Sequence, residues 1–581
     1  MHRVSTIAEH VARPVQIAAS PVVAGSPSAG EGLAVSTARV CAVIVTWNRK
    51  SYVTNVLHAL AKQTYPRILL DVVVVDNSGT DGTLEQLCAA FNPERVVDNN
   101  TERAHEPKFE QPRVREWEPA GQPGASNTLG LSSLSIVRNR ANMGGCGGFN
   151  TGFAFVEHWF CQNGLPGPDF VWLVDDDVDL PTDALANLVR VMESDQRIGL
   201  VGSRTCDIND RARTIETTIY FNSDAGTMQD DAPAGHARHD EHTQWIRKVG
   251  GPRGQGGAEG YRGTMNVDVV SACSMLSRWR AVLGAWAPDG KSRASGVGFW
   301  DHRYFIYCDD ADWCLRFARA GWRVVLSLDA VVFHTPWNLK LTPARIYYAN
   351  RNRLWMVQKT LPEQRLREVT EKAMRSFLFD SMHAAAHRRQ FHARIILRTG
   401  LDTAENVVGK TGSDGPPAMP TGQAFAQTGV LCGGRVAVLA SSADAMRHFA
   451  QVQRVVREHV QQTPGAVEPT WIPIVRNDVA NPPANAVIYG RHLGSRLKKQ
   501  WYVLLKRPRA VVVLDQVNDF PVLLCAPWTI HVDSKKPEIA QIERDGWMAR
   551  LGFAWRWVRA RPKMLRYART VRPFVAGTRY G

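Results

Sequence analysis

This chain of 581 residues contains no apolar run long enough to cross a membrane. A spanning helix needs about 18 to 20 consecutive apolar residues, whereas runs such as Val40–Val45 have only the length of a strand. Residues 1–38 also lack the continuous apolar core of a secretory signal, so we expect a disordered N-terminal tail. These absences favour a cytoplasmic protein without a membrane span.

Paired cysteines are also missing. The ten cysteines are scattered, and no two of them form a Cys-x-x-Cys pair. Zinc sites and disulfide frameworks usually show such regular spacing. Several cysteines, including Cys41 and Cys525, stand inside apolar runs. We therefore expect buried, reduced thiols rather than a zinc or disulfide framework.

Acidic residues are absent from the last part of the chain. Residues 546–581 contain nine Lys/Arg and no Asp or Glu, and aromatic residues alternate with arginines over 547–559. A basic, aromatic segment of this kind suits an anionic membrane surface, although a packed terminal helix would also explain it. Pro562 and Pro573 are expected to break any single long helix.

The net charge of +15 raises the question of nucleic-acid binding. A nucleic-acid-binding protein should carry a basic stripe with aromatics within its folded core. Here the excess positive charge is concentrated at the terminus, and acidic residues follow the predicted strands. The sequence therefore predicts no nucleic-acid partner and favours a smaller anionic ligand, such as a nucleotide.

Strand and helix signals alternate from Arg39 onward, which predicts the α/β class. The strands are apolar throughout, and helical spacing follows them, so the pattern indicates a mostly parallel sheet covered by helices. The predicted strands are Val40–Val45, Leu69–Val75, Leu134–Val137 and Phe170–Val174. Two polar, glycine-containing stretches, 96–130 and 222–262, are predicted to be loops.

Composition also predicts the domain organisation. A stretch rich in Gly, Pro and Thr at 409–429 reads as a linker. Around it we expect a catalytic domain, a helical region packed on that domain, a small C-terminal α/β domain and a basic terminal segment. The corresponding ranges are 39–345, 346–408, 430–545 and 546–581.

Two acidic clusters carry the chemistry. Asp175, Asp176 and Asp177 follow a buried strand, and Asp309, Asp310 and Asp312 stand much later in the chain, with His334 beyond them. Carboxylates that crowd a strand end repel one another unless a positive charge lies among them. Oxygen ligands suit Mg²⁺ or Mn²⁺. The sequence thus indicates metal-assisted chemistry on a phosphorylated substrate, against the alternative of solvated turns and helix caps.

Five motifs in order resemble family 2 glycosyltransferases of the GT-A fold, over roughly Arg39 to Trp355. They are Val43-Ile44-Val45-Thr46-Trp47-Asn48-Arg49, Val74-Val75-Asp76-Asn77-Ser78-Gly79, the glycine loop Asn142-Met143-Gly144-Gly145, Asp175-Asp176-Asp177, and Phe305-Ile306-Tyr307-Cys308-Asp309-Asp310-Ala311-Asp312-Trp313. The resemblance is greatest to bacterial cell-wall enzymes. Each motif alone is weak, but five at plausible spacing make a specific pattern.

The resemblance implies a role for each motif residue. Asp310 would be the catalytic base, and Asp175, Asp177 and His334 would hold Mn²⁺ or Mg²⁺. Acceptor binding would fall to Asp309 and Asp312, and to Trp300, for which a core position is an equal alternative. The nucleotide and donor sugar would contact Thr46, Asn48, Arg49, Asp76, Asn142, Gly144, Gly145 and Asp176.

The same resemblance implies an inverting glycosyltransferase that builds cell-wall or surface glycan. Actinobacterial galactofuranosyltransferases are most similar, which favours UDP-galactofuranose as the donor; rhamnosyltransferases that use dTDP-rhamnose are the alternative. The acceptor would be polyprenyl-linked or a polysaccharide, at the inner face of the plasma membrane, and the chain would act alone or as a homo-oligomer. A non-catalytic scaffold that binds nucleotide sugars is a remote third hypothesis.

Overall fold

The structure is a computed structural model of the whole chain. It describes residues 36–110, 127–162, 167–251, 253–255, 261–284, 296–336, 342–411, 416–440, 442–490, 492–514, 526–533 and 536–574. The predicted N-terminal tail lies, except for its last residues, outside the described residues. None of the described helices is both long enough and apolar enough to span a membrane.

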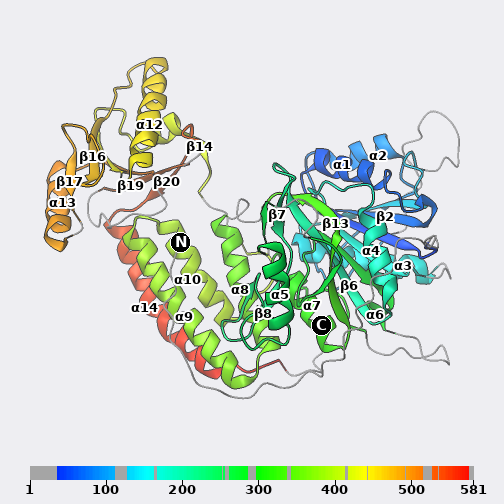
Figure 1. Cartoon of the computed structure of the whole chain (residues 1–581). Coiled ribbons are helices and arrows are strands. Elements are labelled where there is room, and N and C mark those ends of the chain that lie inside the picture. Colours follow the sequence, from blue (N-terminus) through cyan, green and yellow to red (C-terminus); the bar gives the residue numbers. More distant parts are fainter. Residues whose placement is uncertain are drawn as a thin grey trace.

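A mixed, mostly parallel sheet forms the larger of two α/β units (Figure 1). Eleven of the described strands belong to it. Along the sheet they run β10 (Gly254–Gln255), β7 (Arg213–Glu216), β6 (Ile198–Asp207), β12 (Ser274–Arg278), β5 (Phe170–Asp175), β1 (Val40–Thr46), β2 (Leu70–Asp76), β4 (Ser133–Asn139) and β3 (Arg95–Asn99). The strand β13 (Arg323–His334) pairs parallel with β6, and β11 (Thr264–Asn266) pairs with β13. The predicted α/β class is confirmed.

Both faces of this sheet are buried, which explains the continuous apolar runs of its strands. In β1, Cys41 and Val43 pack into one core with Phe149 and Phe153. Val40, Ala42 and Ile44 point into the other core. The first face is covered by α3 (Gly144–Gln162) and α7 (Asp309–Arg319), and the second by α1 (Lys50–Leu60), α2 (Thr83–Phe91) and α4 (Ala184–Ser194).

The two predicted loops are wrong in part. The first contains most of β3, which pairs parallel with β4 at the edge of the sheet. The second contains the hairpin strand β9 (Thr227–Gln229) and helix α5 (His239–Val249). Helix α5 has acidic residues in its first turn, basic residues in its last turn and Gly250 at φ +79° after its end. Those charges and the glycine favour a helix that has few apolar positions.

A second, seven-stranded sheet lies at the opposite end of the molecule within the described residues. Its order is β14 (Met419–Pro420), β20 (Ile539–Arg544), β19 (Trp528–Val532), β18 (Ala510–Val513), β15 (Arg435–Ala440), β16 (Thr470–Arg476) and β17 (Val487–Tyr489). The strands from β19 to β17 in this order are parallel. Helices α11 (Thr421–Gln427), α12 (Ala443–Gln462) and α13 (Leu493–Lys506) accompany this sheet.

A helical layer joins the two sheets (Figure 1). It consists of α8 (Pro343–Thr360), α9 (Glu363–Ala386), α10 (Gln390–Ala404) and the terminal helix α14 (Trp547–Thr570). The expectation that Pro562 would break the terminal helix is wrong, because α14 runs through it. A proline removes a single backbone hydrogen bond, and the packing of Phe553, Ala560 and Met564 in the core holds the helix together on both sides of it.

Candidate active site

The proposed metal ligands meet at one edge of the large sheet. Asp175 is the last residue of β5, and His334 is the last residue of β13. A bridge between Asp179 and Phe333 brings the segments that follow and precede them together. Asp175, Asp177 and His334 each offer one ligand atom, and these atoms lie within 4.8 Å of one another. The two carboxylates offer oxygen ligands of the kind that suit Mn²⁺ or Mg²⁺, and the imidazole adds a nitrogen ligand.

The imidazole is closer to one carboxylate than to the other. His334 Nε2 lies 3.1 Å from Asp177 Oδ1 and 3.8 Å from Asp175 Oδ2. The fractional exposure of the His334 side chain is 14%, against 38% for Asp175. The cluster is thus open on the side of Asp175, from which a diphosphate could approach.

Asp176, the middle residue of the triplet, points away from this cluster into the fold. It is 6% exposed, and it accepts hydrogen bonds from Thr46 Oγ1 at 2.8 Å and Arg49 Nη1 at 2.9 Å. Burial raises the pKa of Asp176 to about 6, although Arg49 and Thr46 oppose the shift. Arg49 also contacts Asp177 Oδ2 at 2.9 Å. Arg49 therefore supplies positive charge that holds the triplet together.

A tight turn follows β2 beside the triplet. Asp76 is 2% exposed, and its Oδ1 accepts from the backbone N–H of Gly79 at 2.8 Å. Asn48 Oδ1 accepts from the N–H of Thr80 at 2.6 Å, and Asn48 itself adopts φ +54°. Burial raises the pKa of Asp76, opposed by the Gly79 N–H. The strands β1, β2 and β5 are adjacent and parallel. The turn with Asn48 after β1 and the turn with Asp76 after β2 therefore lie at the same end of the sheet as Asp175.

The glycine loop is held by an asparagine that the sequence did not single out. Asn77 Nδ2 donates to the carbonyl of Gly144 at 2.9 Å, while Asn77 Oδ1 accepts from Asn139 Nδ2 at 3.0 Å. Asn142 Oδ1 accepts from the N–H of Gly144 at 2.9 Å. Asn77 follows Asp76 at the strand end, and that position was the only signal available. Its role depends on the contact between β2 and β4.

Two glycines of this loop differ in their surroundings. Gly144 has φ +74°, and a Cβ atom there would lie 1.9 Å from the carbonyl oxygen of Phe305. No side chain fits in that position. Gly145 faces open space, with no atom within 4 Å of a Cβ. Gly144 thus brings the glycine loop against the segment that carries Asp310, and Gly145 leaves room for a ligand.

Backbone strain marks the approach to the second acidic cluster. Tyr307 and Cys308 adopt φ +72° and +63°, just before Asp309 begins α7. Non-glycine residues in this region cost about 1–3 kcal/mol each and cluster at functional sites. Asn352 of α8 donates to the carbonyls of Ile306 at 2.8 Å and Tyr307 at 2.9 Å. Asn352 therefore fixes the turn, a role that its position in a helix did not reveal.

Asp310, the proposed base, is half-buried at the start of α7. Its Oδ1 accepts from the N–H of Ala311 at 2.7 Å, and its Oδ2 accepts from the N–H of Ala272 at 3.4 Å. Burial raises the pKa of Asp310, and the charge of Asp175 raises it further. Burial and the neighbouring Asp310 likewise raise the pKa of Asp309. Asp175 acts electrostatically on both carboxyl groups, so the two acidic clusters lie near each other.

A further carboxylate, Glu216, joins this group. It ends β7 and is half-buried. Burial raises the pKa of Glu216 to about 7, the charge of Asp310 raises it as well, and His334 lowers it. Glu216 therefore lies near both the proposed base and a proposed metal ligand. No motif marks Glu216 in the sequence, because the strand Arg213–Glu216 is short and matches none of the five motifs.

Two of the expected acceptor residues are buried in the structure. Trp300 is 4% exposed and packs against Phe149 and Trp313, with ring centroids 4.9 and 6.0 Å away, so it is a core side chain. Asp312 is 2% exposed, and its carboxylate contacts Lys359 Nζ at 2.9 Å and Arg316 Nε at 3.1 Å. Its charge is paired within the fold, and a role of either side chain in acceptor binding stays a prediction.

Comparison with known proteins gives a match in the first part of the large domain. The family model described as "Glycosyl transferase family 2" matches residues 41–104. This range contains β1, β2 and β3, with Thr46, Asn48, Arg49 and Asp76. The matched residues include the first two motifs that carried the resemblance.

A curated relative matches a short segment of this chain. Poly(ribitol-phosphate) beta-N-acetylglucosaminyltransferase TarS of Staphylococcus aureus (strain Mu50 / ATCC 700699) is 44% identical over 43 residues, which is 7% of this chain and 8% of that protein. The match thus spans less than a tenth of the relative. It supports a glycosyltransferase but says nothing of the rest of the chain.

Solved structures show only distant likeness. The crystal structure of S. aureus TarS has a TM-score of 0.33 and 15% identity, covering 64% of this chain and 49% of that one. The mannosyltransferase PcManGT from Pyrobaculum calidifontis, in complex with GDP-Man and Mn²⁺, has a TM-score of 0.32 and 14% identity, covering 65% and 77%. The fold class therefore rests on the sheet itself and on the family match.

Proposed function

We propose that this protein is an inverting, metal-dependent glycosyltransferase that transfers a sugar from a nucleotide diphosphate to a glycan acceptor. The observation that carries the proposal is the metal-ligand cluster of Asp175, Asp177 and His334, with Asp310 near enough to feel the charge of Asp175. The family match at the nucleotide-side turns supports it. A scaffold without activity would not need a strained turn that presents a carboxylate to this cluster.

One group of residues would bind the metal ion, and another would bind the nucleotide. Asp175, Asp177 and His334 would hold Mn²⁺ or Mg²⁺, which when bound would stabilise negative charge on a leaving diphosphate. Arg49 and Thr46 keep Asp176 in place behind the ligands. Asn48 and Asp76 shape the turn that would receive the base and ribose.

Asp310 would take the proton from the attacking acceptor hydroxyl. A carboxylate with a raised pKa is a better proton acceptor near neutral pH than an ordinary aspartate. Asp309 would support it, and the strained turn at Tyr307 and Cys308 would fix its direction. With one base and no covalent nucleophile proposed, the reaction would be a single displacement with inversion at the anomeric carbon.

For the donor we propose UDP-galactofuranose, with dTDP-rhamnose as the alternative. The support is the motif resemblance, including the aspartate at position 309, where the rhamnosyltransferases often have glutamate. The relative that matches part of the chain is named as an N-acetylglucosaminyltransferase, so UDP-N-acetylglucosamine belongs among the donors to test. The proposed acceptor is polyprenyl-linked or a polysaccharide, which places the enzyme at the inner face of the plasma membrane.

The test is nucleotide release from each donor. The purified protein would be incubated with UDP-galactofuranose, UDP-N-acetylglucosamine and dTDP-rhamnose, in Mn²⁺ and in EDTA, with and without a glycolipid acceptor. We expect acceptor-stimulated, metal-dependent release of UDP from the galactofuranose donor. Release of dTDP alone would change the donor, and release from none of the donors would support the scaffold hypothesis.

A further inference from the structure

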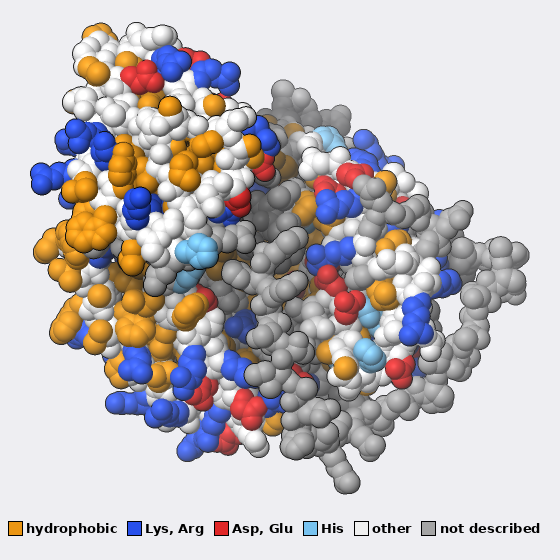
Figure 2. Space-filling view, turned by 60° about the vertical axis from the view of Figure 1, so that its left-hand side comes forward, with side chains coloured by type: hydrophobic (Ala, Val, Ile, Leu, Met, Phe, Trp, Pro, Cys, Tyr) orange, Lys and Arg blue, Asp and Glu red, His pale blue; other side chains and the backbone are white. Residues whose placement is uncertain are grey.

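Helix α14 has apolar side chains on two sides. Phe553, Ala560, Met564 and Ala568 are buried against α9 and α10. On the other side, a strip of five large side chains is exposed by 57–83%: Trp547, Met548, Leu551, Trp555 and Val558. A helix that packs on a core normally has one apolar face, and large exposed apolar groups that gather together mark an interaction site. Figure 2 shows hydrophobic and basic side chains together on this side of the molecule.

Beside this strip lies a groove between α10 and α14. Its volume is about 520 Å³. The lining residues are Phe391, Arg394, Ile395, Leu397, Arg398, Leu401, Phe553, Trp555, Arg556, Arg559, Ala560 and Lys563. Every one of these side chains is either apolar or cationic, and none is acidic. The groove thus combines a hydrocarbon-like wall with five positive charges.

Some of these charges are partly neutralised by acids outside the groove. Arg398 Nε contacts Asp402 Oδ2 at 2.9 Å, and Lys563 Nζ contacts Glu405 Oε1 at 2.6 Å. Arg556 donates only to a backbone carbonyl, that of Gly552 at 3.1 Å, among the hydrogen bonds found within the described residues. Helix α14 contains seven Lys/Arg and no acidic residue. The groove therefore retains a positive field that an anion would compensate.

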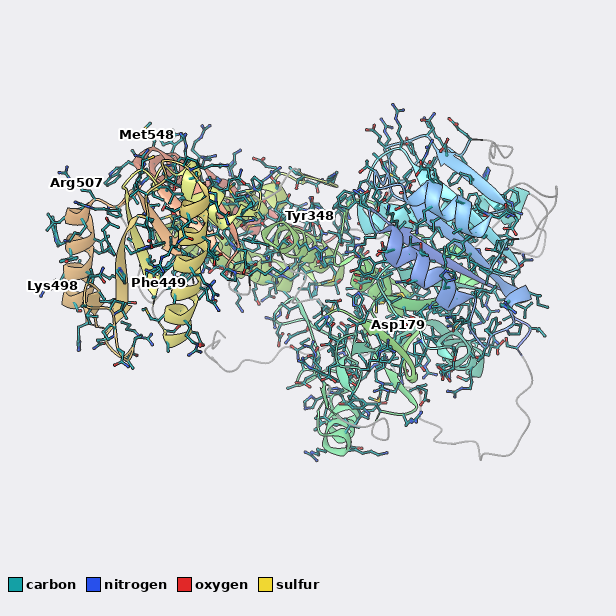
Figure 3. All side chains as sticks on the ribbon, turned by 90° about the horizontal axis from the view of Figure 1, so that it is seen from above. Asp179, Tyr348, Phe449, Lys498, Arg507 and Met548 are labelled. Atoms are coloured by element: carbon teal, nitrogen blue, oxygen red, sulfur yellow. The ribbon has the colours of Figure 1, made fainter. Side chains whose placement is uncertain are left out.

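We propose that this groove binds an anionic lipid of the bilayer, with its phosphate against Arg556 and Arg559 and its hydrocarbon chain along Leu401 and Phe553. The exposed strip of α14 would enter the interface beside it, as basic amphipathic helices with aromatic residues do. This inference rests on the proposed action at a membrane surface, and it assigns the surface and the lipid chemistry. Figure 3 shows Met548 in the half of the molecule away from Asp179, which follows the acidic triplet, so the groove is separate from the site of transfer.

The first experiment measures binding to vesicles. Wild type and the variant Arg556→Ala/Arg559→Ala would be sedimented with vesicles of phosphatidylcholine alone and of phosphatidylcholine with about 30% phosphatidylglycerol, whose anionic headgroups attract basic residues. The matched control is Arg447→Ala/Arg457→Ala, which removes the same charge from exposed positions of α12. We expect binding to the anionic vesicles only, roughly thirtyfold weaker for the groove variant and unchanged for the control.

The second experiment separates the groove from a general surface charge. Calorimetric titration would use monododecyl phosphate below its micellar concentration, inorganic phosphate and dodecyl maltoside. Monododecyl phosphate should bind at one site, and Leu401→Gln and Arg556→Ala/Arg559→Ala should each weaken it at least tenfold. Equal binding of dodecyl maltoside, or unchanged binding by both variants, would overturn the proposal.

Two readouts keep this inference distinct from the proposed function. The affinity for UDP in Mn²⁺ should be the same in wild type and the groove variants, so loss of lipid binding with intact nucleotide binding concerns the groove alone. Light scattering without lipid should give the same mass for wild type and Leu551→Ala/Trp555→Ala. If instead wild type is a dimer that this strip variant dissociates, the strip is an interface between two copies and the lipid proposal is wrong.

Discussion

Replacing Asp310 by asparagine removes the proposed base and keeps the shape of the side chain. An amide oxygen can still accept from the N–H of Ala311, as Oδ1 does at 2.7 Å. Because burial raises the pKa of the Asp310 carboxyl, loss of its charge should not destabilise the fold. We expect the affinity for UDP in Mn²⁺ to stay the same and the transfer rate to fall about 100- to 10,000-fold, or about 3–5 kcal/mol in the barrier.

The matched control is Asp312→Asn in the same helix. Asp312 pairs with Lys359 and Arg316 inside the fold, and breaking a buried pair costs about 3–5 kcal/mol of stability. This variant should have a lower Tm, yet its folded fraction should transfer sugar much faster than Asp310→Asn. Transfer rates are measured by UDP release, and stability by thermal unfolding. Near-normal transfer by Asp310→Asn would remove Asp310 as the base.

Three further predictions follow from the geometry. The transfer rate should fall as the pH drops through the raised pKa of Asp310; a pH profile of kcat should show this limb above pH 4, the region of an ordinary aspartate, and a limb at or below pH 4 would contradict the burial argument. Gly144→Ala should fail to fold or lose activity, because its Cβ would lie 1.9 Å from a backbone oxygen, whereas Gly145→Ala should fold normally; circular dichroism and Tm would compare them, and equal stability would be contrary to expectation. Arg388→Ala should cost about 3–5 kcal/mol in a denaturant titration, because buried Arg388 contacts buried Asp545 at 3.0 Å; a loss below 1 kcal/mol would argue against this contact.

The parts of the site that the sequence predicted are those encoded locally. Asp175–Asp177 come at the end of an apolar run. This run predicts a buried strand from local sequence alone, without knowledge of tertiary contacts. Parallel strands bring their carboxyl ends to one edge, so Asp76 and the triplet could be placed together without a structure. His334 was reached through the resemblance, and the structure places it beside Asp177.

The parts that could not be predicted depend on tertiary contacts. Glu216 lies near Asp310 only because the short strand β7 folds back beside β6. In the sequence, Asn77 and Asn352 are indistinguishable from other polar residues. Only the structure shows that Asn77 donates to the glycine loop and Asn352 to the strained turn. A tryptophan such as Trp300 suits a sugar-stacking surface or a hydrophobic core equally well in the sequence. Only the structure shows that its ring packs against other aromatic rings.

We propose above all that Asp175, Asp177 and His334 hold a divalent ion that binds the nucleotide diphosphate. Calorimetric titration of wild type with UDP, in Mn²⁺ and in EDTA, tests it most directly, with Asp175→Ala/Asp177→Ala as the comparison. We expect wild type to bind UDP tightly only in Mn²⁺ and the variant to bind it weakly in both conditions. Equal affinity of wild type in Mn²⁺ and in EDTA, or tight metal-dependent binding by the variant, would contradict it.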